Sequence, residues 1–152
     1  MKRLILILTI ALSALCSHAE TLLESCENIP GITSVYISKT MLSLASGLDM
    51  HANGIDLGML ISKLDNLVIL NADGKKAKML RDKATKSFKN QSYEKLMTVR
   101  NDGQTVDALV RELGKSRYEY VLYVCEDESA SVIILNGTFT LDEIIAATRV
   151  AR

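Results

Sequence analysis

The sequence predicts an α+β fold in which two to three helices pack on a mostly antiparallel sheet of about five to six strands. Three observations lead to this prediction. Short β-branched runs separated by turn residues recur through the second half of the chain, one central segment has the apolar spacing of an amphipathic helix, and the composition is 48% hydrophobic with a single Pro. No linker or internal repeat divides the 152 residues. We therefore expect one folded domain around one core.

Six segments carry strand or hairpin signals. A β-branched run at residues 32–38 follows the Pro30-Gly31 turn, and an apolar run at residues 67–70 indicates a buried strand. Two further runs, residues 93–100 and 105–111, flank the short connection Asn101-Asp102-Gly103, which is typical of hairpins. The last two, residues 118–125 and 131–135, are joined by a polar acidic segment and indicate a second hairpin.

One of these segments is ambiguous. Within residues 105–113, the apolar positions Val106, Leu109, Val110 and Leu113 have helical spacing, and Gly114 follows as a helix-stop residue. The short length and the preceding turn favour a strand, so we predict a strand there and keep the helix as the alternative.

Three helices are expected. Residues 41–45 form a short one, and residues 75–89 form the clearest one. A last helix begins at the capping box Thr140 to Glu143, with Ile144, Ile145 and Thr148 facing the sheet. Between residues 46 and 58, three glycines and no periodicity predict a long irregular loop.

The first 19 residues predict export. Lys2 and Arg3 precede an apolar stretch at residues 4–15, and Ser17-His18-Ala19 has the small residues of a signal-peptidase site. We expect residues 1–19 to be a signal peptide and residues 20–152 to be a single domain in the periplasm or cell envelope. No second apolar segment follows, so no transmembrane segment is expected after processing.

Four stretches carry a resemblance to a known family when they are taken in order. They are ITSVYISKTML at residues 32–42, KLDNLVIL at 63–70, YEKLMTVRNDG at 93–103 and NGTFTLDEI at 136–144. In this order and spacing the chain resembles domain-of-unknown-function family 4252, small exported proteins of Bacteroides-type bacteria. The resemblance implies an α+β domain with a mostly antiparallel sheet, and it supports a strand at residues 105–111. It implies no catalytic residue, and it hints at a role in envelope regulation.

Two thiols remain after the expected processing, Cys26 and Cys125. An oxidising compartment would allow a disulfide between them, which would tie the N-terminal segment to a late strand. The alternative is that both are small buried apolar residues. A reactive thiolate is disfavoured because acidic residues follow both cysteines and raise a thiol's pKa.

The residues restrict the available chemistry. Equal numbers of basic and acidic residues, 18 of each, give no general attraction for nucleic acid. One His remains after processing, and neither a Gly-x-Ser-x-Gly elbow nor a phosphate-binding glycine loop occurs. We therefore predict a non-enzymatic protein without a cofactor, and keep as an alternative a metal-dependent hydrolase using Asp49, His51 and Asp56.

Other carboxylates and aromatic residues suggest weaker alternatives. Glu119, Glu126, Asp127 and Glu128 include acids that could in principle pair for glycoside cleavage, but we interpret them as solvated hairpin residues. Tyr118 and Tyr120 lie two apart on one strand face and could stack on a sugar, but packing within the protein is the favoured interpretation.

The predicted helix at residues 75–89 has the most distinctive charge pattern. Its apolar positions are Ala77, Leu80, Ala84 and Phe88, and its other positions hold seven cations against one acid, Asp82. Those cations are Lys75, Lys76, Lys78, Arg81, Lys83, Lys86 and Lys89. They form either an ordinary solvated face or a contact face for an anionic surface or an unknown envelope protein. The function expected from the sequence is therefore exported binding, envelope maintenance or regulation.

Overall fold

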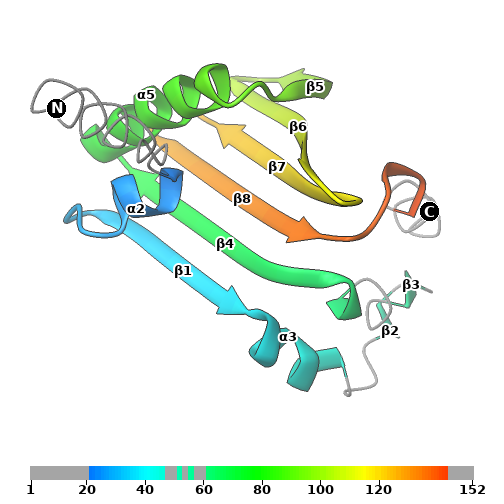
Figure 1. Cartoon of the computed structure of the whole chain (residues 1–152). Coiled ribbons are helices and arrows are strands. Elements are labelled where there is room, and N and C mark those ends of the chain that lie inside the picture. Colours follow the sequence, from blue (N-terminus) through cyan, green and yellow to red (C-terminus); the bar gives the residue numbers. More distant parts are fainter. Residues whose placement is uncertain (1–20, 47–50, 53–54, 57–60, 144–152) are drawn as a thin grey trace, which may run out of the picture.

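The computed structural model describes residues 21–46, 51–52, 55–56 and 61–143. In chain order the elements are α2 (Leu22–Cys26), β1 (Ile32–Ser38), α3 (Lys39–Ser46), β2 (His51–Ala52), β3 (Ile55–Asp56), β4 (Leu64–Asp73), α5 (Lys75–Asn90), β5 (Glu94–Asn101), β6 (Gln104–Gly114), β7 (Arg117–Cys125) and β8 (Ser129–Gly137). Six of the strands form one sheet, and helices pack on it (Figure 1). The predicted α+β class is confirmed.

The large sheet is antiparallel throughout, in the order β1-β4-β8-β7-β6-β5. After β4, helix α5 carries the chain to the far edge, and three hairpin connections bring it back until β8 lies beside β4 (Figure 1). The ambiguous stretch at residues 105–113 belongs to strand β6, so the strand interpretation is confirmed. Its helical spacing of apolar residues is overridden because both neighbours, β5 and β7, pair with it along its length.

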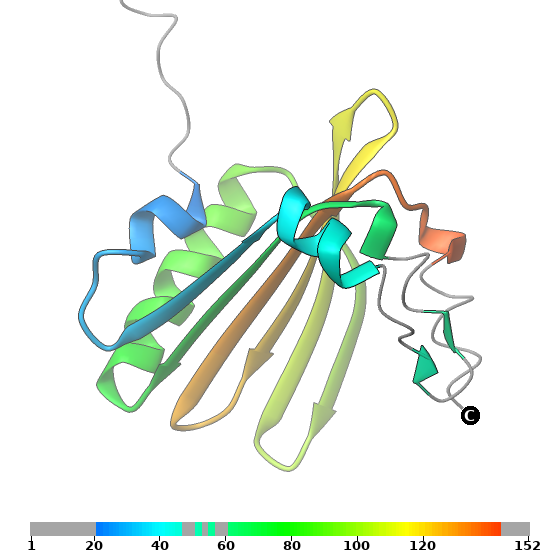
Figure 2. The same ribbon diagram turned by 90° about the horizontal axis from the view of Figure 1, so that it is seen from below.

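Helices α2 and α5 cover one face of the sheet, as Figure 2 shows from a second direction. The expected apolar positions of α5 lie inward, since Ala77, Leu80 and Ala84 are fully buried and Phe88 packs against the same cluster. Leu70 of β4 and Val132 of β8 are fully buried beneath them. This layer forms the main core of the protein.

A second, smaller core lies at one end of the sheet. Phe139, which follows β8, stacks on Tyr120 with 5.0 Å between ring centroids and contacts the cluster that contains Leu42 of α3. Tyr120 is buried and lies 6.1 Å from Tyr118, so packing within the protein is the correct interpretation of this tyrosine pair. At Gly137 an added Cβ would lie only 2.4 Å from the Lys63 carbonyl oxygen, so the close approach of these segments requires glycine.

Several elements differ from the sequence prediction. Helix α3 extends to Ser46, and within the predicted irregular loop the short strands β2 and β3 pair with each other. The buried strand predicted at residues 67–70 extends over all of β4. These differences arise because pairing and packing partners extend elements that local composition predicts only in part.

The predicted capping box at the C-terminal end is confirmed. The Thr140 amide donates to Glu143 Oε2 at 2.8 Å, and the Glu143 amide donates to Thr140 Oγ1 at 3.4 Å. Ile144, Ile145 and Thr148 lie outside the described residues. In the described part of the chain, no helix has both the length and the apolar composition needed to cross a membrane.

Candidate functional site

The predicted basic face lies on helix α5. The helix begins after Gly74, whose φ of +54° permits the sharp turn out of β4, and it ends next to Gln91. At 100° per residue, burial of Ala77, Leu80 and Ala84 fixes which side faces the sheet. The cations therefore divide into an outer group pointing to solvent and a flanking group beside the sheet.

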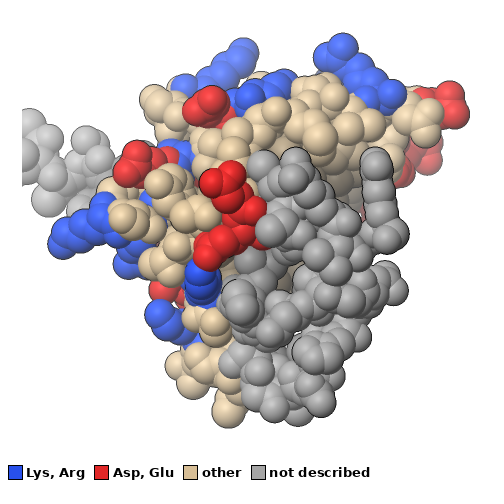
Figure 3. Space-filling model, turned by 90° about the vertical axis from the view of Figure 1, so that its right-hand side faces the viewer, with Lys and Arg blue, Asp and Glu red and all other residues tan. Residues whose placement is uncertain are grey.

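The outer group consists of lysines that are all exposed: Lys75, Lys78, Lys86 and Lys89. We call these four residues the outer lysines. No lysine of α5 forms an ion pair with any residue that the structure describes. In Figure 3, basic side chains stand along the upper margin, on the side of the molecule where α5 lies in Figure 1.

The flanking group has structural contacts. Arg81 Nη1 donates to the Glu126 carbonyl oxygen at 2.6 Å, which attaches α5 to the turn between β7 and β8. Lys76 lies beside Gly31, where its Cγ would be 3.0 Å from an added Cβ, and Lys83 is half-buried. The sequence thus predicted seven cations on one helix, but only the outer four are exposed.

The two cysteines lie against the same core. Cys26 is fully buried in α2, and Cys125, at the end of β7, packs against the cluster that contains Cys26. Both are free thiols in the structure, with Cys26 buried and Cys125 half-buried. A disulfide between them stays a prediction.

One of the three residues of the alternative metal site lies outside the described residues. His51 and Asp56 are paired in the β2–β3 ladder, whereas Asp49 lies outside the described residues. Among the residues that the structure does describe, no group of three or more His, Cys, Asp or Glu side chains is placed to hold a metal ion. The metal site at Asp49, His51 and Asp56 therefore stays a prediction.

A second candidate site, which the sequence did not reveal, crosses the helix-covered face of the sheet. Strand register aligns one polar residue from each of five strands, and we call this set the polar row. Its members, in order from β1 to β6, are Ser38, Asn66, Asn136, Glu119 and Arg111. Asn136 Nδ2 donates to Asn66 Oδ1 at 2.8 Å, and Arg111 Nη2 donates to Glu119 Oε1 at 2.6 Å.

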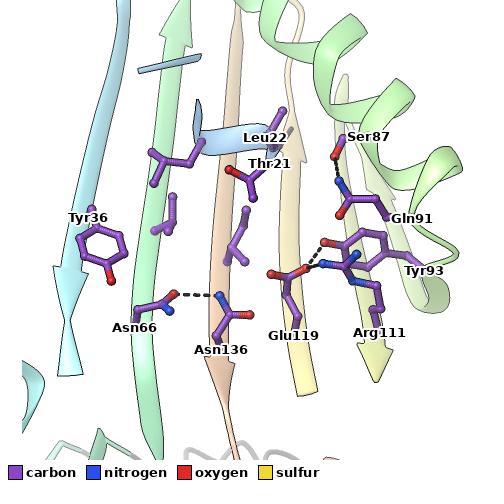
Figure 4. Close-up of a pocket in the computed structure, with 13 residues that line it drawn as sticks. Thr21, Leu22, Tyr36, Asn66, Ser87, Gln91, Tyr93, Arg111, Glu119 and Asn136 are labelled. Carbon is purple, nitrogen blue, oxygen red and sulfur yellow. Dashed lines mark hydrogen bonds and ion pairs between the residues drawn. The ribbon is translucent and has the colours of Figure 1, made fainter. Parts of the chain in front are cut away.

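The polar row borders a cavity of about 170 Å³ between the sheet and the two helices. Figure 4 shows Asn66, Asn136, Glu119 and Arg111 side by side at its lower end. Thr21 and Leu22 at the start of α2, with Ser87 and Gln91 at the end of α5, approach it from the helix layer. Part of its floor is apolar, formed by Val68 and Ile134. The lining therefore combines a polar and an apolar side.

The charges of the polar row are paired with each other. Glu119 accepts hydrogen bonds from Arg111 and from the Tyr93 hydroxyl, and the Arg111 guanidinium carbon lies 4.9 Å from the centre of the Tyr93 ring. The side chain of Glu119 is only 12% exposed and that of Arg111 25%. Burial raises the pKa of the Tyr93 phenol well above its usual range, and the negative charge of Glu119 raises it further.

Two polar atoms beside this cluster have no partner among the residues that the structure describes. Arg111 Nε, a hydrogen-bond donor, and Asn136 Oδ1, an acceptor, are both buried without a hydrogen bond there. An unpaired buried polar group costs about 1–3 kcal/mol, so such atoms are uncommon away from functional sites.

The interpretation of Glu119 as a solvated hairpin residue is wrong. It lies in the middle of the polar row, apart from Glu126, Asp127 and Glu128, which are exposed at the opposite end of β7. The register of the β6–β7 hairpin, which opposes Arg111 and Glu119, is the signal that could have identified the pair. The Asn66–Asn136 contact joins residues 70 apart, which no local pattern reveals.

Comparison with known proteins gives one family match. The family model described as "Domain of unknown function (DUF4252)" matches residues 27–147, about four-fifths of the chain. No curated protein matches the chain. The matched region contains β1, α5, the whole large sheet and the polar row.

Proposed function

Since the chain belongs to the DUF4252 family, whose description assigns no activity, we propose that it is an exported, non-enzymatic binding domain of the cell envelope that contacts an anionic membrane surface through α5. The observation that carries this proposal is the set of four outer lysines, which are exposed and unpaired within the described structure. Export rests on the leader at residues 1–19, which lies outside the described residues.

The position of the outer lysines suits a flat anionic surface. Lys75 and Lys78 lie near the start of α5 and Lys86 and Lys89 near its end, so the four charges span nearly the whole length of the 16-residue helix. At 1.5 Å per residue that length is about 24 Å. Each Lys near an anionic surface contributes about 1 kcal/mol, so the set would contribute about 4 kcal/mol at moderate salt.

The contacts of the polar row favour a structural role for its charged pair. Glu119 Oε1 accepts hydrogen bonds from both Arg111 and the Tyr93 hydroxyl. Burial and the charge of Glu119 raise the pKa of the Tyr93 phenol, which makes it a weaker acid.

Membrane binding is tested by sedimentation of the processed protein with vesicles of mixed anionic and zwitterionic lipid. Replacing the four outer lysines by Gln should weaken binding roughly 10³-fold, which corresponds to the lost 4 kcal/mol. In the control variant, Gln replaces four cations that lie outside α5: Lys39, Lys95, Arg100 and Lys115. Equal losses of vesicle affinity in the two variants would contradict binding through α5. Binding of the processed protein to an envelope protein in place of lipid would identify a protein partner.

Export is tested separately by cell fractionation and N-terminal sequencing. We expect the protein outside the cytoplasm with Glu20 as its first residue. A full-length chain beginning at Met1 in the cytosol would contradict export and leave the lipid-binding result unaffected.

A further inference from the structure

The two edges of the large sheet differ in how they are protected against pairing. Unpaired edge strands usually carry charges, proline or a bulge that discourages association with another strand. Strand β5 has such protection, because a bulge interrupts its register with β6 between Lys95 and Met97, and Glu94, Lys95 and Arg100 lie along it.

Strand β1 has none of these features. Its seven residues, sequence ITSVYIS, include no charge and no proline, and it pairs with β4 continuously from Ile32 to Ser38 without a bulge. Val35 is 40% exposed and Tyr36 is 57% exposed. Figures 1 and 2 show no described element on the outer side of β1.

We propose that β1 pairs antiparallel with β1 of a second copy of this chain, which joins two sheets into one continuous twelve-stranded sheet. A second copy is favoured because the strand is neutral: in the register that pairs all seven residues, Val35 lies opposite itself and no charged residue of the strand opposes another. Pairing of β5 with β5 of a second copy is opposed by the bulge and by the charges of that strand.

The symmetry of this dimer fixes the placement of the helices. An antiparallel pair of identical edge strands is related by a two-fold axis normal to the sheet, so both copies keep their helix layers on the same side. Both α5 helices then lie on one side of the dimer. This arrangement adds to the proposed surface contact but does not depend on it, since dimer formation is measured without lipid.

Analytical ultracentrifugation of the processed protein tests the pairing. We expect a concentration-dependent dimer, and both Val35→Lys and Val35→Glu should raise its dissociation constant about tenfold, because each places like charges opposite each other in place of an apolar contact. An equimolar mixture of the two variants should form a heterodimer at least as tight as the wild-type dimer. Val99→Lys on β5, where the valine is 46% exposed against 40% for Val35, is the control and should remain dimeric.

Circular dichroism confirms that each variant is folded before the comparison is made. A wild-type chain that stays monomeric at all concentrations would overturn the proposal. So would a Val35→Lys variant that dimerises normally, or a mixture that fails to restore the dimer.

Discussion

The outer lysines and the polar row are two charged regions that lie on opposite sides of the helix layer. They differ in whether their charges are exposed and whether they are paired. The outer lysines are exposed and form no ion pair within the described structure, whereas the row pairs Arg111 with Glu119 and leaves both largely buried. Charge that is paired and buried holds the fold together, because removing one partner leaves the other unsatisfied. Charge that is exposed and unpaired contributes little to the fold and remains available for a partner.

The largest effect expected from this comparison is on stability at the polar row. Glu119→Ala removes the carboxylate that accepts hydrogen bonds from Arg111 and Tyr93. Both half-buried donors then lose their acceptor, so the free energy of unfolding should fall by about 2–4 kcal/mol. Urea denaturation followed by circular dichroism measures this change.

Two controls sharpen the result for Glu119. Glu126→Ala, at an exposed carboxylate, should change the free energy of unfolding by no more than about 0.5 kcal/mol. The double variant Glu119→Leu with Arg111→Met should recover much of the lost stability, since no buried charge then remains unpaired. An unaffected Glu119→Ala variant would show that the row does not stabilise the fold.

A smaller effect is expected in acid, and it involves another paired carboxylate, Asp107 on β6. Burial acts to raise the pKa of Asp107, but hydrogen bonds from Thr98 and Lys95 outweigh burial and hold it below its ordinary value. A folded-state pKa below the unfolded value means that the contribution to stability is complete above about pH 4 and is lost as the pH falls further. Asp107→Asn should therefore flatten the decline of stability below pH 4, while replacing the outer lysines by Gln should leave its shape unchanged. Parallel acid curves for all three proteins would contradict this assignment.

The smallest effect on stability is expected at the outer lysines themselves. Lys75 and Lys78, like Lys86 and Lys89, are like charges three residues apart on a helix, an arrangement that costs a few tenths of a kcal/mol. Replacing all four by Gln should leave the free energy of unfolding unchanged or raise it by about 0.5 kcal/mol. A loss above 1 kcal/mol in urea denaturation would show that these lysines serve the fold.

A region can be predicted from the sequence when the residues that form it are close together in the chain. A region formed by distant segments cannot. The amphipathic spacing of Ala77, Leu80 and Ala84 is local, so α5 and its cations can be predicted from a short window. The apolar residues of strand β6 have helical spacing, and its pairing with the neighbouring strands is what makes it a strand. The polar row depends on the register of five strands, and the regular β4–β8 register that runs from Asn66 to Asp73 places Asn66 opposite Asn136. Such long-range alignment leaves no pattern in a single sequence.

The most direct test of the account is a salt titration of vesicle binding by the processed protein and by the variant in which Gln replaces the four outer lysines. Exposed unpaired charges are screened by salt, so we predict that wild-type affinity falls steeply as ionic strength rises from about 0.01 to 0.15 M, while the variant binds weakly with a much shallower dependence. Wild-type binding that is absent or unaffected by salt would contradict the claim that α5 contacts an anionic surface.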